Sequence, residues 1–175
     1  MAIPQKYLLS YANKSIITES IEHFSKRASS GIMAFLCHSH LDSKLAEGVQ
    51  KLFVAKGVDI YIDWQDAEMP PVPNIETAQN IKHRIRSSQL FFFLATENSV
   101  KSRWCPWEIG IADSMAKKIY IIPTQDANRE THGNEYLQLY NRVDIGTRES
   151  DEGVDYGIFS PHGGKGIIIS TEAFR

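Results

Sequence analysis

The sequence predicts an α/β fold built on an open, mostly parallel sheet with helices on both faces. Between residues 32 and 123, short apolar runs alternate with segments in which apolar residues recur at helical spacing. Runs that are apolar at every position are typical of strands buried on both faces of a sheet. The alternation of such strands with helices favours parallel pairing through right-handed crossovers.

The expected elements follow one another in a regular order. Strands are expected at residues 32–37, 58–63, 90–95 and 119–122. Helices with one apolar face are expected at residues 41–53, 75–88 and 103–117. The prolines within residues 64–74 predict a loop after the second strand, because proline interrupts helices and sheets. Ligands of such sheets bind beyond the carboxyl ends of the strands, where His38, Asp63 and Thr96 stand.

Both flanks of this core are expected to add smaller elements. Residues 1–30 are predicted to form an N-terminal helical extension, because apolar residues recur at helical spacing as far as Phe24. Residues 31–175 are predicted to form one domain, whose motif-bearing core is residues 32–123. The C-terminal elements expected are a short helix at Tyr136–Tyr140, a strand at Arg142–Ile145, and a hairpin with arms 158–159 and 167–170 around the turn 161–164.

Composition excludes several classes of protein. The chain has 175 residues and a net charge of −2 with mixed signs, so we expect neither nucleic acid nor a membrane as a partner. No apolar run approaches the length of a membrane span, and the N-terminus lacks the pattern of a signal peptide. Two cysteines, Cys37 and Cys105, do not make a disulfide framework, which favours a reducing cytoplasm.

Three small patterns have explanations simpler than a site. His38 and His40 are a pair without a matching Cys/His cluster, so no metal is expected. Cys105 has no visible base partner and is expected to be a packed thiol. Residues 163–166, Gly-Gly-Lys-Gly, lack the Ser or Thr after lysine and the following helix of a phosphate loop, so a hairpin turn is expected.

The segment from Ser102 to Gly110 carries the main candidate residue, Glu108. Pro106 predicts that a helix begins here, because proline is tolerated in a first helical turn. Trp104 and Glu108 are four residues apart and share a helix face, at the sheet edge where ligands bind. We expect the helix dipole to favour the ionised carboxylate. A surface glutamate beside core tryptophans would show the same spacing, so spacing alone leaves both interpretations open.

Three motifs, taken in order, resemble the Toll/interleukin-1 receptor (TIR) domain family. Residues 34–42 are similar to its first conserved box, and residues 61–64 with the following proline-rich loop are similar to its second strand and BB loop. Residues 104–108 resemble its Trp-x-x-x-Glu motif. The resemblance covers residues 32–123 and is nearest to the bacterial TIR proteins of Thoeris-like anti-phage defence systems. It implies a flavodoxin-like sheet.

The resemblance also implies cleavage of the bond between nicotinamide and ribose in NAD⁺, with Glu108 as the catalytic residue. NAD⁺ would then be a consumed substrate, and no cofactor is expected. Glycoside hydrolysis ordinarily needs two carboxylates. Nicotinamide already carries positive charge in NAD⁺ and leaves neutral, so one carboxylate is sufficient to stabilise the cationic ribose.

The resemblance places further residues against the substrate. They are His38, Ser39, Asp63, Trp64, Glu68, Trp104 and Trp107. Either Trp64 or Trp107 would stack on a base or on nicotinamide. Asp63 as a loop cap and Glu68 as a solvated side chain remain open alternatives.

The resemblance implies several products and two kinds of partner. The product would be ADP-ribose, a cyclic isomer or a conjugate, and a lone TIR domain suits a producer of a signal for a separate effector protein. The alternative is a non-enzymatic adaptor that assembles through the BB loop, Trp64–Asn74. Enzymes of the family also self-associate, so the two are compatible. A nucleoside deoxyribosyltransferase on a similar sheet is a third possibility, which the order of motifs disfavours.

Overall fold

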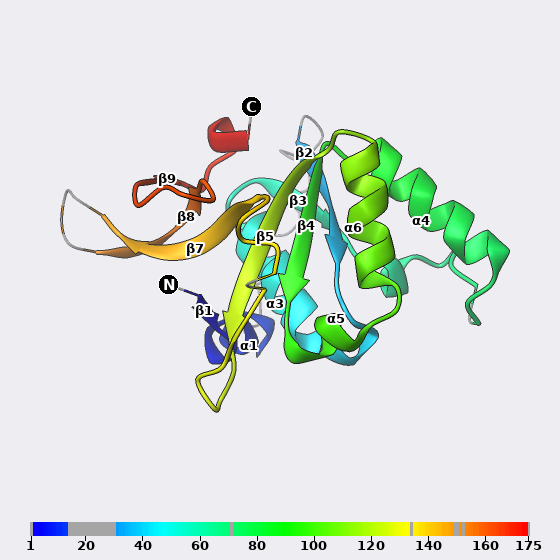
Figure 1. Ribbon diagram of the computed structural model, residues 1–175, viewed down its shortest axis with the longest axis horizontal. Helices are drawn as coiled ribbons and strands as arrows, with labels where there is room; N and C mark the ends of the chain where they lie inside the picture. Colours follow the sequence, from blue (N-terminus) through cyan, green and yellow to red (C-terminus); the bar gives the residue numbers. More distant parts are fainter. Residues whose placement is uncertain are drawn as a thin grey trace.

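The computed structural model describes residues 2–13, 31–70, 72–133, 135–148, 151 and 153–174. It contains one open sheet with helices on both faces, so the predicted fold class is confirmed (Figure 1). The strands lie in the order β3-β2-β4-β5-β7-β8-β9. Their bounds are β2 (Ile32–Cys37), β3 (Val58–Tyr61), β4 (Leu90–Ala95), β5 (Lys118–Gln125), β7 (Asn141–Thr147), β8 (Val154–Phe159) and β9 (Gly166–Ile168).

The strands from β3 to β7 are parallel, and β8 and β9 extend one edge in antiparallel fashion. The chain passes from β2 outward to β3 and then returns to place β4 on the other side of β2. The order of strands therefore reverses between β2 and β4. In open α/β sheets the ligand crevice forms at such a reversal, beyond the carboxyl ends of the strands.

The helices divide between the two faces of the sheet. They are α1 (Gln5–Asn13), α3 (Ser43–Val54), α4 (Ile75–Ser87), α5 (Glu97–Lys101) and α6 (Cys105–Ser114), with short 3-10 turns η2 (His40–Asp42), η3 (Asp63–Gln65) and η4 (Glu172–Phe174). α4 and α6 lie together on one side of the sheet (Figure 1). α1 and α3 contribute to the core on the opposite side.

The central strand β4 shows why the sheet needs both helical layers. All six of its residues are buried. Side chains alternate across a strand, so Leu90, Phe92 and Leu94 join the core under α3. Phe91 and Phe93 join the core under α4 and α6. This is the burial on both faces that the continuous apolar run predicts.

Local sequence sets where the helices on the α4 side begin. The Asn74 side chain accepts a hydrogen bond from the Thr77 backbone amide at 3.0 Å, and the Thr77 hydroxyl accepts one from the Asn74 backbone amide at 3.1 Å, a capping box that starts α4. α6 has Pro106 in its first turn, as predicted, and begins at Cys105, two residues after the predicted 103. Its end at Ser114 comes earlier than the predicted 117.

The N-terminal segment packs closely on the domain. α1 confirms a helix in the predicted extension, and an unpredicted strand, β1 (Ile3–Pro4), pairs with β5. The α1 backbone approaches α3 at Gly48, where an added Cβ would lie 2.1 Å from the Leu8 carbonyl oxygen. Glycine therefore permits this contact. The predicted extension continues into residues 14–30, which lie outside the described residues, so its boundary stays a prediction.

The C-terminal part differs from expectation in detail. Residues 136–140 form hydrogen-bonded turns where a short helix was expected, so that prediction is wrong. A single turn of helix has little stability of its own, and here Tyr136 packs on Phe93 with ring centroids 5.0 Å apart. The predicted hairpin is confirmed as β8 and β9 around residues 160–165. The antiparallel pairing of β7 with β8, the helix α5 and the strand β6 (Thr131–His132) were not predicted.

Candidate active site

The carboxyl ends of β2, β3 and β4 bring several predicted site residues to one edge of the sheet. His38 follows β2 directly, Asp63 opens η3 after β3, and Thr96 follows β4. His38 Nε2 lies 3.7 Å from Asp63 Oδ1, which joins two of these ends. α6 begins at the same edge, and the negative charge of Asp63 raises the pKa of its Glu108 carboxyl.

Glu108 lies in the first turn of α6 with only 5% of its surface exposed. Its amide donates to the Trp104 carbonyl at 2.9 Å, so these two residues share one helix face, as predicted. Burial raises the pKa of the Glu108 carboxyl to about 8, and the nearby Cys37 thiol acts against this rise. The negative charge of Asp63 acts in the same direction as burial. The surface-glutamate alternative is therefore wrong.

The expectation that the helix dipole keeps Glu108 ionised is also wrong. A dipole contributes about 0.3–1 kcal/mol at a helix terminus. Removing a carboxylate from water raises its pKa by up to 3–5 units, about 4–7 kcal/mol. Desolvation therefore dominates, and burial favours the protonated form of Glu108.

The His38 ring has a buried nitrogen, Nε2, that points to an acceptor role in the site. Its side chain is 2% exposed, and Nδ1 lies 3.1 Å from the Leu36 carbonyl oxygen. A carbonyl only accepts, so Nδ1 carries the hydrogen and Nε2 of the neutral ring carries a lone pair. Among the described residues Nε2 has no hydrogen-bond partner, although the Asp63 carboxylate lies beside it. A hydrogen-bond donor on a ligand would complete the bonding of Nε2.

The three tryptophans differ in their surroundings. Trp104 and Trp107 are half-buried and meet edge to face, with ring centroids 5.3 Å apart. Lys82 of α4 lies over the Trp107 ring, 5.5 Å from its centroid. Trp64, in η3, is 44% exposed. Trp64 therefore offers more free ring surface to a ligand than Trp107 does.

Ser39 and Glu68 have structural partners of their own. The Ser39 hydroxyl accepts a hydrogen bond from the Leu41 amide at 3.4 Å and caps η2. The Glu68 carboxylate is exposed and pairs with Arg84 of α4 at 2.9 Å. Substrate contacts by these two residues stay predictions, and neither side chain is brought to Glu108 by a contact that the structure shows.

Asp66 anchors the BB loop, a role that the sequence analysis missed. Its carboxylate accepts from the Tyr61 hydroxyl at 2.7 Å and pairs with Arg84 at 2.7 Å. The hydrogen bond from Tyr61 lowers the pKa of Asp66, and the Arg84 guanidinium adds to the effect. The loop therefore starts from a fixed position against α4. The signal in the sequence that could have indicated this role is an acidic residue three positions after Asp63.

Asp42 is a second missed residue, and it joins the ends of β2 and β4. This buried carboxylate accepts hydrogen bonds from the Thr96 hydroxyl at 2.5 Å and from the side-chain amide of Asn98 at 2.7 Å. The Thr96 hydroxyl also accepts from the Ser99 amide and caps α5. These bonds fix the loop that leads into α6, and Asp42 stood in the first motif as a polar residue after a buried strand.

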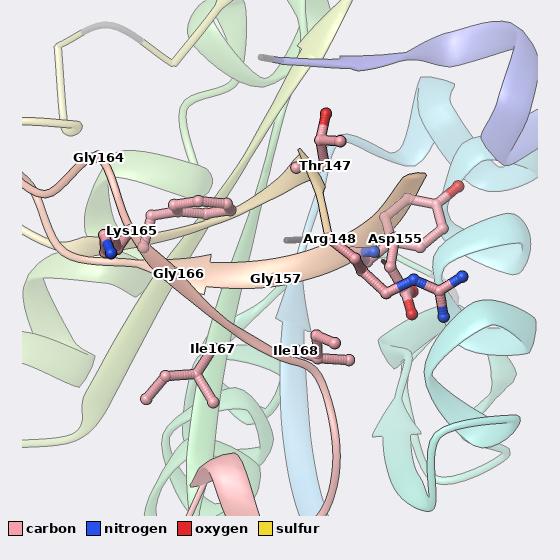
Figure 2. A pocket seen from close by; sticks show the side chains of 12 residues that line it. Thr147, Arg148, Asp155, Gly157, Gly164, Lys165, Gly166, Ile167 and Ile168 are labelled. Atoms are coloured by element: carbon pink, nitrogen blue, oxygen red, sulfur yellow. Dashed lines mark hydrogen bonds between the residues drawn. The ribbon is translucent and has the colours of Figure 1, made fainter. Parts of the chain in front are cut away.

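A hollow of about 400 Å³ lies elsewhere, in the C-terminal hairpin (Figure 2). β7, β8 and β9 line it, and Arg148, Asp155 and Lys165 are its charged residues. Asp155 pairs with Lys56 and Arg148 with Asp151. None of the predicted site residues lines it. The chemistry of Glu108, and not the size of this hollow, therefore locates the candidate active site.

The described residues offer neither a metal cluster nor a membrane-spanning helix. Among them, no group of three or more His, Cys, Asp or Glu side chains is arranged to hold a metal ion. Within the same residues, no helix combines the length and apolar character needed to cross a membrane. Cys105 is fully buried, as expected for a packed thiol.

Comparison with known proteins gives a consistent result. A family model described as "TIR domain" matches residues 34–155. The chain is similar to "Probable 3' cyclic ADP-D-ribose synthase ThsB'" of Bacillus cereus (strain MSX-D12), 32% identical over 140 residues that cover 78% of this chain and 72% of that protein. It is also similar to "Putative cyclic ADP-D-ribose synthase TIR2" of Cytobacillus dafuensis, 28% identical over 95 residues that cover 53% of this chain and 25% of that protein.

Proposed function

Because the chain belongs to the TIR domain family, we propose that it cleaves the nicotinamide–ribose bond of NAD⁺ and makes a signalling nucleotide from the ADP-ribose half. One observation carries the proposal: the buried carboxyl of Glu108 stands at the ligand edge of the sheet, in the helix turn that carries Trp104 and Trp107. The names of the two relatives support a cyclic ADP-ribose isomer as the product.

The environment of Glu108 suits a cationic substrate. In the free protein, burial favours the protonated carboxyl. The nicotinamide ring of NAD⁺ carries a positive charge, so its binding favours the ionised form. As the bond to ribose breaks, positive charge moves from the ring to the sugar, where the Glu108 carboxylate stabilises it. Nicotinamide leaves neutral, so no second carboxyl has to protonate it.

His38 and Asp63 are proposed to hold the substrate by a hydroxyl group. The lone pair of His38 Nε2 and the Asp63 carboxylate are both acceptors, 3.7 Å apart. A sugar hydroxyl placed there donates a hydrogen bond to His38 Nε2, which has no hydrogen-bond partner among the described residues. This contact orients the ribose relative to Glu108. Such orientation contributes strongly to rate.

Aromatic side chains are proposed to line the rest of the pocket. Trp64 has the exposed ring surface needed to stack on a base, and Trp104 and Trp107 support the wall near Glu108. Ser39 and Glu68 are proposed to contact the substrate from the first loop and the BB loop. A cyclic product requires that an atom of the substrate, and not water, attack the ribose, so a closed aromatic wall favours cyclisation.

The BB loop is proposed to mediate self-association that completes the pocket. Trp64, Val72 and Ile75, in and next to the loop, are 44%, 71% and 79% exposed. Apolar side chains gathered at one exposed loop are typical of an interaction surface. The nucleotide product would activate a separate effector protein in anti-phage defence. A reducing cytoplasm, which keeps Cys37 and Cys105 as thiols, is the proposed location.

Incubation of the purified protein with NAD⁺ over a range of protein concentrations tests the proposal. Chromatography should detect nicotinamide and a cyclic ADP-ribose isomer, with specific activity that rises as the protein assembles. Glu108→Gln should release no nicotinamide under the same conditions. The surface variant Glu76→Gln should match the wild type.

A non-enzymatic adaptor is the second candidate, and the exposed apolar side chains of the BB loop favour it. It predicts that loop substitutions abolish signalling in cells, while Glu108→Gln has no effect. Absence of nicotinamide release from the assembled protein, together with a fully functional Glu108→Gln variant in cells, would establish the adaptor.

A further inference from the structure

The His38 ring carries a lone pair that no hydrogen bond of the described residues uses. Nδ1 lies 3.1 Å from the Leu36 carbonyl oxygen, so Nδ1 carries the hydrogen and Nε2 of the neutral ring keeps the lone pair. Among the described residues, two buried side-chain nitrogens lack a hydrogen-bond partner, His38 Nε2 and Arg148 Nε. A guanidinium nitrogen only donates. His38 Nε2 is therefore the one buried acceptor among these residues that has no partner.

This lone pair lies near the start of the helix that carries Glu108. His38 follows Cys37, whose Sγ lies 3.8 Å from the carbonyl oxygen of Cys105, the first residue of α6. Glu108 stands in the first turn of the same helix. The Asp63 carboxylate lies 3.7 Å from Nε2 and is held by a hydrogen bond from the next backbone amide at 2.8 Å. Nε2 therefore has a fixed negative charge beside it and the proposed catalytic turn nearby.

The other oxygen acceptors at this edge of the sheet are engaged or open to water. The two oxygens of Asp42 already accept hydrogen bonds from side chains that follow β4. The Ser39 hydroxyl accepts from a backbone amide of η2. The Asp63 side chain is 39% exposed, whereas that of His38 is 2% exposed. A ligand hydroxyl bound at Nε2 is therefore shielded from water, and its proton needs a protein group to receive it.

A cyclic product makes such a receiving group necessary when a hydroxyl is the nucleophile. An adenine nitrogen attacks with a lone pair that it already carries. A hydroxyl instead has to lose its proton as its oxygen forms the new bond. A positioned base contributes about 10²–10⁴-fold to a step of this kind, and histidine is the side chain that serves most often. Imidazole is also a stronger base in water than a carboxylate.

We propose that His38 is the general base of cyclisation, which takes the proton of a ribose hydroxyl in the ADP-ribose half as that oxygen attacks the other ribose. The proposal rests on the NAD⁺ cleavage proposed above. The hydroxyl oxygen bonds to the carbon that bore nicotinamide, and the carbon–nitrogen bond breaks with its electron pair left on neutral nicotinamide. The hydroxyl proton moves to Nε2 and passes to water after release of the products. NAD⁺ thus gives the cyclic product, nicotinamide and one proton.

The surroundings of the ring suit both of its charge states. The positive charge that His38 gains is stabilised by the Asp63 carboxylate, 3.7 Å from Nε2. Nδ1 donates to the Leu36 carbonyl before and after the transfer, so the ring keeps its orientation. The proton therefore moves without a rearrangement of the side chain.

The ratio of cyclic product to ADP-ribose among the products of the purified protein tests the proposal. In His38→Gln, the amide oxygen replaces Nε2 as a hydrogen-bond acceptor but does not take up a proton at neutral pH. Departure of nicotinamide needs no base, so water captures the ribose that cyclisation fails to capture. Whatever the rate of nicotinamide release, the ratio should fall at least about tenfold in His38→Gln. His40→Gln, at an exposed histidine two positions along, is the matched control and should keep the wild-type ratio.

Failure of the base and failure of the proposed function give different results. No nicotinamide from the assembled wild type would remove the proposed function and the base with it. Nicotinamide release with only ADP-ribose from the wild type, or with an equal ratio in His38→Gln, would overturn the base and leave NAD⁺ cleavage standing. If His38→Gln does not fold, ¹⁵N NMR of the wild type decides. A hydrogen on Nδ1 and an Nε2 signal that moves on addition of ADP-ribose support the base, whereas a hydrogen on Nε2 or an unmoved signal overturns it.

Discussion

The Glu108→Gln substitution is expected to stabilise the protein at pH 8 while it abolishes NAD⁺ cleavage. The Glu108 carboxyl is buried, and its pKa lies at about 8 instead of the ordinary 4.5. The folded protein therefore holds a proton that the unfolded chain has already released. Stability is full below the ordinary pKa and falls as pH rises through the window between 4.5 and 8. Glutamine keeps the size of the side chain and has no charge to bury.

The magnitude follows from proton linkage. Each pH unit within the window changes the free energy of unfolding by about 1.4 kcal/mol when one proton separates the two states. Between pH 5 and pH 8 the wild type should lose on the order of 3 kcal/mol through Glu108. This is a large share of the 5–15 kcal/mol that is typical of a domain. Glu108→Gln should lack this loss.

Urea unfolding at pH 5, 6, 7 and 8 measures the effect, with the free energy of unfolding extrapolated to water. The difference between Glu108→Gln and wild type should grow steadily with pH. Glu76→Gln is the matched control, because Glu76 also stands in the first turn of a helix but is exposed. Its stability curve should run parallel to that of the wild type.

A constant difference between Glu108→Gln and wild type across this pH range would refute the reasoning. It would mean that Glu108 is ionised and solvated in the folded protein, so that burial does not set its charge state. If the stability difference grows with pH but Glu108→Gln still turns over NAD⁺ at the wild-type rate, burial sets the charge state of Glu108 as argued, but Glu108 is not the catalytic residue.

Three further substitutions test other parts of the structure. Asp66→Asn breaks the ion pair with Arg84 and should lower the free energy of unfolding by about 1–3 kcal/mol in urea; no change would show that the loop is not anchored there. Gly48→Ala places a methyl against the Leu8 carbonyl and should cost about 1–3 kcal/mol, with faster proteolysis of the N-terminal segment; an unchanged cleavage rate would argue against the close contact. Trp64→Ala should leave stability within about 0.5 kcal/mol and lower kcat/KM for NAD⁺ about tenfold; equal kinetics would assign the stacking to another ring.

Much of the sheet was predictable because buried parallel strands have a simple signature. β2 and β4 are apolar at every position, and the structure buries all six residues of β4 and the last four of β2, although Met33 near the start of β2 is exposed. The start of α6 was predictable because proline is compatible with few positions of a helix. These elements depend on local sequence and on burial, both of which a pattern of residues encodes.

Other elements depended on partners far away in the chain. The turns at residues 136–140 carry apolar residues at helical spacing, but the packing of Tyr136 on Phe93 stabilises them in place of a helix. The antiparallel pairing of β7 with β8 follows from contacts across the sheet edge. The roles of Asp42 and Asp66 likewise arise from hydrogen bonds to Thr96 and Arg84, on other elements.

The sequence by itself determined that one carboxylate, Glu108, begins a helix at the ligand edge of the sheet. Only the tertiary structure decided that this carboxyl is buried and that its pKa rises to about 8. The reason is that the pKa of a group depends on the water it loses and on the charges around it. For Glu108 those neighbours come from β2 and η3, which folding brings together and which no local spacing reveals.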